Sequence, residues 1–550
     1  MPANDLHATA FPKFTDDQMA GLGECHLCRR KRYRDGQALF RAGDRDPRFF
    51  VVVSGHIEIV DELGDPPRTI VVHDPKGFAG DVSLISGRPA VVSGYARGDT
   101  EVYEVSPDAL KQLLNHDPEL GDMILQAFIA RRQLLRDPSV GFTGLRVLGS
   151  HSSQEAFRVR DFLNRNAQPF TWLDPDTDPL ARDLLRLFGL TEADTPVVSC
   201  GRHLVLKQPT PRQLAEATGL RRMPEPRVFD LVVVGAGPAG LAAAVYGASE
   251  GLSTVVLETM APGGQAGRSM RIENYLGFAG GIEGEKLIAQ AVMQASKFGA
   301  CLPVGAPVGG LSFDGRLCVV HLDGDETVRA KCLLIATGAE YRVLGVEGCA
   351  RYEGRGVYYA ATPMEAKTCA GAEVVVVGGG NSAGQAAVYL SRHARQVYVV
   401  IRGNDLYKNM SSYLATRVEG TENVEVHKNT EVSRLDGDGS LERVELANRK
   451  TGEVKRLSCP ALFSFIGAVP RTDWLPPEIE RDDKGFVKTG PGLASSTRWT
   501  AKRSPFYLET TRPGVFAAGD VRSGSVKRVA SAVGEGAMAV QFVHEHLKDL

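Results

Sequence analysis

The sequence has no apolar run approaching the roughly 18 residues that a membrane-spanning helix needs. Its first residues, MPANDLHATAFPKF, lack the basic segment and apolar core of a secretory signal peptide. Cysteine is sparse and scattered, with nine residues in 550, so a disulfide framework is excluded. Only Cys25 and Cys28 have CxxC spacing, and no second pair completes a zinc site. We therefore expect a cytoplasmic protein without a metal centre.

An excess of charge of either sign is also missing. The formal net charge is −2, which provides no long-range field for nucleic acid or an anionic membrane surface. The main exception is the basic run RRKRYR, from Arg29 to Arg34, which is typical of a solvated strand or helix end. We expect neither nucleic acid nor a membrane as a partner.

The chain is too long for one ordinary domain, and its 43% hydrophobic content suffices for several cores. Three segments differ in pattern: residues 10–140, residues 143–222 and residues 228–550. The polar linker RRMPEPR separates the second segment from the third. The fold class expected is α/β overall.

Residues 10–140 alternate short apolar strands with glycine turns, as in LFRAGDRDPRFFVVVSGHIEIV, and are followed by a helix. This pattern resembles the cyclic nucleotide-binding domain, a mainly β roll. In that family a Gly-Glu pair and an Arg about nine residues later bind the ribose and the cyclic phosphate. Here these places hold Gly80-Asp81 and Ala90, with Arg88 two residues earlier. Two interpretations remain open: a cyclic nucleotide site, or a degenerate sensory or dimerisation domain.

Residues 143–222 follow the order β-α-β-α-β-β-α. This order resembles the thioredoxin or glutaredoxin fold, and Thr195-Pro196 stands where that fold places a cis-proline. The position of the redox CxxC reads His151-Ser152-Ser153-Gln154, so no thiol chemistry is expected there. Cys200 is expected to be buried rather than reactive.

The stretch FDLVVVGAGPAGLAAAVYGASEGLSTVVLE predicts a strand, a GxGxxG turn, a helix and a second strand that ends in a carboxylate. The glycines allow a tight turn, close approach of a pyrophosphate and close helix packing, and the acid binds a ribose hydroxyl. The residues predicted to bind this dinucleotide are Gly235, Gly237, Pro238, Ala239, Gly240 and Glu258.

A second copy of the pattern, VVVVGGGNSAGQAAVYLSRHARQVYVVIR, ends in an arginine instead of an acid. A guanidinium pairs with the 2′-phosphate that a carboxylate would repel, which favours NADPH over NADH. The residues predicted to bind it are Gly378, Gly380, Asn381, Ser382, Ala383, Arg402 and Lys408, the last being equally explained as a solvated loop charge. The opposite terminal charges indicate two different dinucleotides, FAD at the first site and NADPH at the second.

The whole of residues 228–550 resembles the low-molecular-weight thioredoxin reductase family. The resemblance rests on the motifs GGQ, IENYLGF, LLIATGA and GVFAAGDV and on an arginine near the start of the closing helix. It implies that FAD is surrounded by Gly263, Gly264, Gln265, Asn274, Gly338, Gly519, Asp520 and Arg528.

The same resemblance implies a homodimer in which each subunit contains two Rossmann-like domains. The FAD domain is split into residues 228–342 and 463–550, and the NADPH domain occupies residues 343–462. The sequence departs from the family at Val529, where Gln is usual, and at Ile401 and Gly403 around the second arginine site.

The redox-active CxxC of that family falls in GVYYAATPMEA, where its two cysteine places hold Ala360 and Pro363. Neither residue can carry or resolve a disulfide, so no catalytic residue is assigned. The chain resembles the dithiol-free branch, such as thioredoxin reductase-like ferredoxin–NADP reductases. Cys369 is expected in the core, and Tyr358 or Tyr359 either stacks near the flavin or packs in the interior.

We therefore expect hydride transfer from NADPH to FAD and then to an external acceptor: ferredoxin, a quinone, a low-molecular-weight disulfide or oxygen. Two alternatives remain open. One is a thioredoxin reductase that uses Cys25 and Cys28 or exogenous thiols. The other is a signalling protein whose flavin state or N-terminal ligand controls association.

Overall fold

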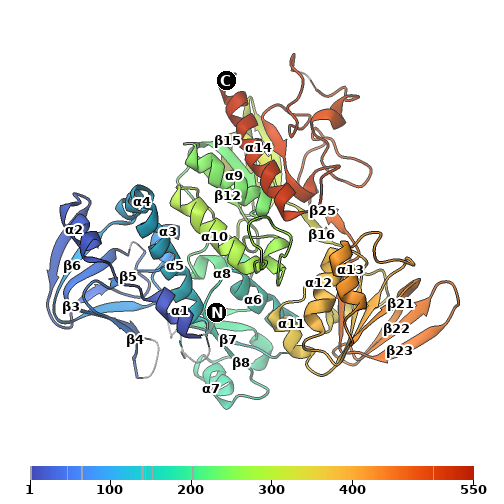
Figure 1. The fold of residues 1–550 in the computed structure, drawn as a ribbon, viewed down its shortest axis with the longest axis horizontal. Helices are drawn as coiled ribbons and strands as arrows, with labels where there is room; N and C mark the ends of the chain where they lie inside the picture. The colour runs from blue at the N-terminus through green and yellow to red at the C-terminus, as the bar shows by residue number, and fades with distance from the viewer. Residues whose placement is uncertain are drawn as a thin grey trace.

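The structure is a computed structural model that describes residues 3–45, 47–62, 66–137, 142, 144–151, 153–200, 204–499 and 501–550. Ser152, at the place of the small domain's expected redox pair, lies outside the described residues. Figure 1 shows an N-terminal unit beside a small α/β unit, and two larger sheet domains that two connecting strands join. Among the described residues, no helix combines the length and apolarity needed to cross a bilayer.

The N-terminal unit is a β-roll whose main path runs β1-β6-β3-β4, all antiparallel. Its elements are α1 (Ala3–Ala10), α2 (Asp16–Glu24), β1 (Cys28–Tyr33), β2 (Ala38–Phe40), β3 (Phe49–Asp61), β4 (Arg68–His73), β5 (Phe78–Ala79), α3 (Ser83–Ser86), β6 (Ser93–Val105), α4 (Pro107–His116) and α5 (Pro118–Leu135).

The single helix expected at the end of this unit is two helices. Asp117 ends α4 and caps α5 with its side chain, and Pro118 occupies the first position of α5. Since proline has no N–H to donate and favours the first turn, the chain restarts a helix at this point.

The basic run forms β1, and its charge is compensated on the neighbouring strand. Arg30 and Arg32 pair with Glu101, and Lys31 pairs with Glu104 across the β1–β6 ladder. The run is a solvated strand, as expected.

The small unit contains a four-stranded sheet in the order β10-β9-β7-β8, in which only β7 and β8 are parallel. The element order is the one predicted, and the Thr195–Pro196 peptide bond is cis. The elements are β7 (Leu145–Leu148), α6 (Gln154–Arg165), β8 (Phe170–Leu173), α7 (Pro179–Leu187), β9 (Val197–Cys200), β10 (Leu204–Lys207) and α8 (Pro211–Ala217).

The first large sheet has the order β12-β11-β15-β14-β13, with β26 paired to β15. Its parallel strands β12, β11, β15 and β26 are covered by α9, α10 and α14. The elements are β11 (Val228–Val234), α9 (Pro238–Ser249), β12 (Thr254–Leu257), α10 (Gly284–Lys297), β13 (Val308–Asp314), β14 (Leu317–Leu322), β15 (Thr327–Ile335), β26 (Val515–Ala517) and α14 (Val529–Lys548).

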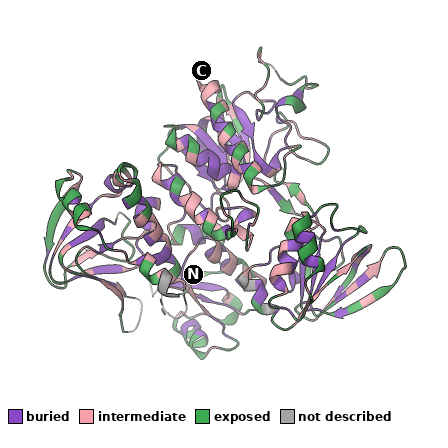
Figure 2. Cartoon of the chain, in the orientation of Figure 1, coloured by how far each residue is buried: buried purple, intermediate pink, exposed green. Residues whose placement is uncertain are grey.

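The second large sheet is parallel, in the order β17-β24-β18-β19-β20, and β21, β22 and β23 form a separate antiparallel sheet beside it. The elements are β17 (Val357–Tyr358), α11 (Pro363–Thr368), β18 (Glu373–Val377), α12 (Asn381–Leu390), β19 (Gln396–Val400), α13 (Ser412–Glu419), β20 (Val424–His427), β21 (Thr430–Asp436), β22 (Arg443–Asn448), β23 (Val454–Ser458) and β24 (Ala461–Ser464). Figure 2 shows the central strands of both large sheets buried and the outer faces of α13 and α14 exposed.

Two antiparallel strands connect the large domains: β16 (Ala339–Tyr341) on the outward path and β25 (Ala468–Pro470) on the return. Because β24 pairs with β18, the second sheet continues to Ser464, two residues beyond the expected end of this domain at residue 462. The return crossing therefore begins after β24.

Candidate functional site

The first glycine turn joins β11 to α9. Gly235 has φ of 101°, which favours glycine, and a Cβ on it would lie 2.5 Å from the Ala336 carbonyl oxygen. A Cβ on Gly240 would lie 1.9 Å from the Gly235 carbonyl oxygen, so the helix packs directly on the turn. A Cβ on Gly237 would have no atom of the surrounding chain within 4 Å, and the expected pyrophosphate would approach this open space.

Two loops distant in sequence converge on this turn. The Gly263 amide donates to the Ala236 carbonyl at 2.7 Å, and a Cβ on Gly264 would lie 3.3 Å from Gly237 Cα. A Cβ on Gly519 would lie 3.1 Å from that of Ala239. The GGQ and GD motifs therefore meet at the N-terminus of α9.

Glu258 follows β12 and accepts hydrogen bonds from the backbone of both neighbouring turns. Its Oε2 accepts from the Ala236 amide, and its Oε1 accepts from the Met260 amide, each at 2.9 Å. The carboxylate is thereby fixed beside the glycine turn.

Three further predicted flavin residues lie outside the helices and strands of the first large domain. Gly338 follows β15 in the left-handed conformation with open space above it, and Asn274 is exposed in the 272–278 loop. Arg528 is exposed and precedes α14. Val529, the next residue, packs against the apolar cluster of Ile272 and Ile282, so the start of α14 meets the IENYLGF loop.

The GD turn has a support that the sequence analysis missed. Glu535 Oε2 accepts a hydrogen bond from the Gly519 amide at 2.7 Å, and Glu535 also pairs with the Arg522 guanidinium. The side chains of Glu535 and Arg522 are only 12% and 9% exposed. Burial raises the pKa of Asp520, against the opposing effect of the Lys527 ammonium. A carboxylate within the small-residue sequence VGEGA was the available signal.

The second glycine turn joins β18 to α12. Gly378 has φ of 141°, and a Cβ on it would lie 2.5 Å from the Phe465 carbonyl oxygen. A Cβ on Gly380 would have only the Asn409 carbonyl oxygen nearby, at 3.9 Å, so the space beside this glycine is open. Asn381 donates to Ser411 Oγ at 3.0 Å and accepts from the Ser411 amide at 2.7 Å. Asn381 therefore fixes the end of the loop that carries the predicted cations.

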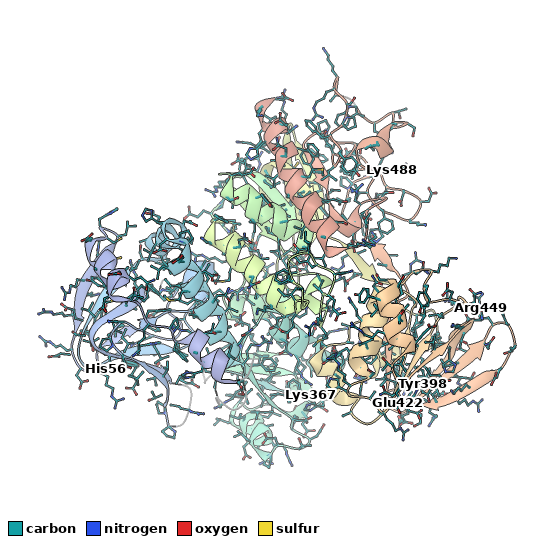
Figure 3. All side chains as sticks on the ribbon, viewed as in Figure 1. His56, Lys367, Tyr398, Glu422, Arg449 and Lys488 are labelled. Atoms are coloured by element: carbon teal, nitrogen blue, oxygen red, sulfur yellow. The ribbon has the colours of Figure 1, made fainter. Side chains whose placement is uncertain are left out.

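Both predicted cations of this loop reach solvent. Arg402 has a 68% exposed side chain, and its Nε lies 3.7 Å from Glu431 Oε2. Glu431 also lies 3.6 Å from Arg449, which follows β22 in the separate antiparallel sheet and is labelled in Figure 3. Lys408 is exposed on the same loop.

A cavity of about 100 Å³ lies between the two large domains and joins three predicted positions. Gln265 reaches it from the loop after β12, Ser382 from the second glycine turn, and Ala360 from the segment before β18. The buried Gln265 Oε1 has no hydrogen-bond partner among the described residues. No cysteine is among the described residues that line this cavity.

Arginines surround the same cavity, and one of them joins the domains. Arg268, Arg271, Arg392 and Arg417 line it, together with one carboxylate, Glu273. Arg417 of α13 donates to both oxygens of Glu273, at 3.0 and 2.9 Å. This ion pair connects the second domain to the IENYLGF loop of the first.

The two tyrosines of GVYYAATPMEA have different environments. Tyr358 is buried between Phe157 of α6 and Phe463 of β24, with ring centroids 6.1 and 5.4 Å away. Tyr358 is therefore an interior packing residue. Tyr359 lines the interdomain cavity, and its buried hydroxyl lies beside the Cys349 thiol. Burial raises the pKa of Tyr359.

The small unit contacts both large domains through α6. Arg268 pairs with Asp161 at 3.2 Å, and Asn166 donates to the Met260 carbonyl at 2.8 Å. On the other side Phe157 covers Tyr358, and Figure 3 labels Lys367 of α11 at this junction. At the start of α6 the Ser153 hydroxyl caps the helix by accepting from the Ala156 amide.

All nine cysteines are free thiols, so none forms a disulfide. Cys369 is fully buried, as expected, and its thiol donates to the Glu365 carbonyl. Cys200 is half-buried, and burial raises the pKa of its thiol.

Cys25 and Cys28 flank the turn between α2 and β1. Burial and a hydrogen bond with Cys25 raise the pKa of Cys28 to about 12. Figure 1 shows α2 at the outer side of the N-terminal unit.

Comparison with known proteins agrees with this geometry. Residues 229–536 match the family described as pyridine nucleotide-disulphide oxidoreductase, and residues 30–117 match the cyclic nucleotide-binding domain. Thioredoxin reductase of Bacillus subtilis is 33% identical over 329 residues, which is 60% of this chain and 98% of that protein. Thioredoxin reductase of Treponema pallidum is 34% identical over 323 residues, 58% and 98% of the two chains.

Two solved structures share the arrangement of the large domains. Lactococcus lactis thioredoxin reductase, described as in the FR conformation, has a TM-score of 0.53 and 29% identity, covering 58% of this chain and all of that one. Thioredoxin reductase of T. acidophilum has a TM-score of 0.53 and 30% identity, covering 58% and 99%. The chain is an oxidoreductase that belongs to the pyridine nucleotide-disulphide oxidoreductase family and carries an N-terminal cyclic nucleotide-binding domain.

Proposed function

We propose that this protein is an NADPH-dependent FAD oxidoreductase that passes electrons to an external acceptor without a dithiol of its own. The observation that carries the proposal is the interdomain cavity, where Gln265, Ser382 and Ala360 meet and no described cysteine is present. When bound, the cofactors supply hydride transfer from nicotinamide to flavin N5.

The first domain fits FAD. The open space above Gly237 and the N-terminus of α9 suit a pyrophosphate, and Glu258 suits the adenosine ribose. The unpartnered Gln265 Oε1 faces the cavity and accepts from a donor such as the flavin ring N–H. Asp520, held by the turn that Glu535 supports, is placed for the ribityl or phosphate region.

The second domain fits NADPH. The open point above Gly380 receives the pyrophosphate, and Arg402 is solvent-accessible for pairing with the 2′-phosphate. Its Glu431 contact, at 3.7 Å, is long for an ion pair and is readily replaced by a phosphate.

An internal thiol route has no support in this arrangement. The family's first cysteine place is Ala360, which is only 8% exposed, and Phe157 of α6 covers the adjacent Tyr358. A thioredoxin-like α6 unit thus occupies the surface that a disulfide substrate would need to reach. The CxxC pair at Cys25 and Cys28 lies in the outer part of the N-terminal unit, and the raised pKa of Cys28 disfavours its reactive thiolate.

The acceptor therefore reaches the flavin from outside the chain. Four arginines against one glutamate around the cavity favour an acceptor with an acidic surface or an anionic group. Within the expected classes this favours an acidic protein carrier such as a ferredoxin over a neutral quinone, a low-molecular-weight disulfide or oxygen.

We also propose a homodimer built on the first large domain. Leu276 of the IENYLGF loop is 93% exposed, and Val526 before α14 is 57% exposed. Large apolar side chains this exposed on a loop and the neighbouring segment are typical of an association surface. Sedimentation velocity of the wild type and Leu276→Asp tests this, with a shift to monomer expected for the variant.

Anaerobic titration of the FAD-loaded protein tests the function. We expect one equivalent of NADPH to bleach the flavin absorbance, with NADH much less effective. If neither nucleotide bleaches a stoichiometrically bound flavin, the proposal fails and a sensory role is favoured. Retention of FAD on gel filtration separates failed hydride transfer from failed cofactor binding.

A further inference from the structure

The N-terminal β-roll contains a cavity of about 150 Å³ at the place where Gly80, Asp81 and Ala90 come together. It is lined by residues of the roll, by His7 of α1 and by the end of α5. Most of the lining is apolar, including Phe40, Ile59, Ile70, Leu84 and Leu134.

Two arginines line this cavity: Arg48, which is exposed, and Arg131, which comes from an unexpected element. Arg131 of α5 lines the cavity, and the whole residue is only 8% exposed. Its Nε donates to the Ala10 carbonyl at 2.8 Å and its Nη1 to the Gly80 carbonyl at 2.6 Å. Its buried Nη2 has no hydrogen-bond partner among the described residues.

No carboxylate pairs with this guanidinium among the described residues. The nearby Asp81 accepts from the Ser83 amide through Oδ1, and its Oδ2 lies 3.6 Å from Arg132 instead. Arg131 contacts the faces of Phe78 and Phe11, 4.4 and 5.4 Å from its guanidinium carbon. Burial lowers the pKa of Arg131 to about 9, against the opposing effect of the Asp81 carboxylate, which lines the same cavity. A buried charge without an ionic partner within pairing distance is costly, so an anionic occupant that contacts Arg131 directly would stabilise this site.

The buried histidine of the lining, His73, does not provide a further cation. His73 lines the cavity and is buried, and burial together with the Arg131 charge lowers its pKa well below the usual value. His73 is therefore neutral, with one donor nitrogen and one acceptor nitrogen.

The size and polarity of the cavity disfavour a nucleotide. A cavity of about 150 Å³ with an apolar lining accommodates a benzene-sized molecule, whereas pockets for larger ligands span roughly 300–1,000 Å³. Ala90 provides no cation where the family's phosphate-binding arginine is expected, and Arg88 lines a different pocket, between this unit and the first large domain.

We propose that this cavity binds a small monocarboxylate with an apolar body of about the size of benzoate, its carboxylate accepting from Arg131 Nη2. Leu134 and Leu135, which follow Arg131 on α5, contact the same cavity. The next residue, Arg136, pairs with Glu285 of α10 in the first large domain. The occupant therefore touches the helix that connects the roll to the flavin-type domain.

Isothermal titration calorimetry of the full-length protein tests the proposal with benzoate, benzamide and cyclic AMP. We expect benzoate to bind with a 1:1 stoichiometry and benzamide, its neutral isostere, at least tenfold more weakly. Arg131→Met should abolish benzoate binding, whereas Arg97→Met, at an exposed arginine of the same unit, should leave it unchanged.

A second variant keeps the test decisive if Arg131→Met does not fold. Ile70→Phe fills the cavity without altering Arg131, and it should also abolish benzoate binding. Equal affinity for benzamide and benzoate, unchanged benzoate binding by Ile70→Phe, or binding of cyclic AMP without benzoate would each overturn the proposal. So would the absence of benzoate binding by the wild type.

Discussion

The Gly519 amide donates a 2.7 Å hydrogen bond to Glu535, a buried carboxylate on the last helix of the chain. Glu535 is anchored in turn by Arg522, and a Cβ on Gly536 would lie 2.1 Å from the Ala239 carbonyl oxygen. The closing helix therefore packs on the first glycine turn and at the same time fixes the GD turn beside it. Two sequence segments almost 300 residues apart thus form one predicted flavin site.

Removal of this carboxylate should loosen the GD turn and leave the Arg522 guanidinium buried and unpaired. We expect Glu535→Ala to lower the free energy of unfolding by about 3–5 kcal/mol and to weaken FAD retention. Chemical denaturation and flavin fluorescence on dialysis measure the two effects. Glu545→Ala removes a carboxylate from the exposed face of the same helix, where it pairs with Lys548, and should change neither. Equal behaviour of the two variants would contradict this role of Glu535.

Arg402 should determine the choice between the two pyridine nucleotides. Arg402→Ala is expected to lower kcat/KM for NADPH by about 10- to 100-fold, the value of a charge-assisted hydrogen bond, and to leave NADH unaffected. Steady-state flavin reduction assays with both nucleotides provide the measurement. Lys408→Ala, in the same exposed loop, should have a smaller effect. A parallel loss with NADPH and NADH would show that Arg402 acts on the fold or the shared part of the nucleotide.

Cys28 should be unreactive at neutral pH. With its pKa raised to about 12 by burial and by the contact with Cys25, the thiol stays protonated, and its reactivity increases only as the pH approaches that value. We expect alkylation of Cys28 at pH 8 to be more than about a hundredfold slower than that of free cysteine. Mass spectrometry of iodoacetamide-treated protein measures this. Rapid labelling of Cys28 would instead support the thiol-dependent alternative.

Phe157 should protect the segment that contains Ala360. Phe157→Ala removes the ring that packs on Tyr358, a loss of about 1–3 kcal/mol of local stability for a half-buried aromatic side chain. Amide hydrogen exchange in residues 357–362 should then accelerate by roughly tenfold or more. Arg158→Ala, at the exposed neighbour, is the matched control. Unchanged exchange in both variants would show that α6 does not cover this segment.

The sequence was most informative where backbone geometry limits the residue type. Gly235 and Gly378 have positive φ values, and the strand, turn and helix around each follow as predicted. The split at Asp117-Pro118 was missed because the helical period continues through it, although the proline itself was a visible signal. The end of the second sheet at Ser464 depends on the pairing of β24 with β18, which local patterns do not specify.

The missed parts of the site depend on contacts between distant segments. Nothing near Tyr358 in the sequence indicates that Phe157 lies against it, and nothing near Gly519 indicates Glu535 as its acceptor. Arg131 is a similar case, because family patterns place the anion-binding cation near Ala90, whereas the structure provides one from α5. Such residues follow from tertiary packing, which residue spacing alone does not reveal.

The central claim is that electrons leave the flavin for an external acceptor without passing through a thiol. Double-mixing stopped-flow tests it most directly: the FAD-loaded protein is reduced anaerobically with NADPH and then mixed with ferredoxin, a quinone, or thioredoxin with DTNB. We predict that ferredoxin or a quinone reoxidises the flavin rapidly, at a rate unchanged in the Cys25→Ser, Cys28→Ser double variant. Thioredoxin should not accelerate flavin reoxidation. Thioredoxin-dependent reoxidation that the double variant loses would contradict the claim.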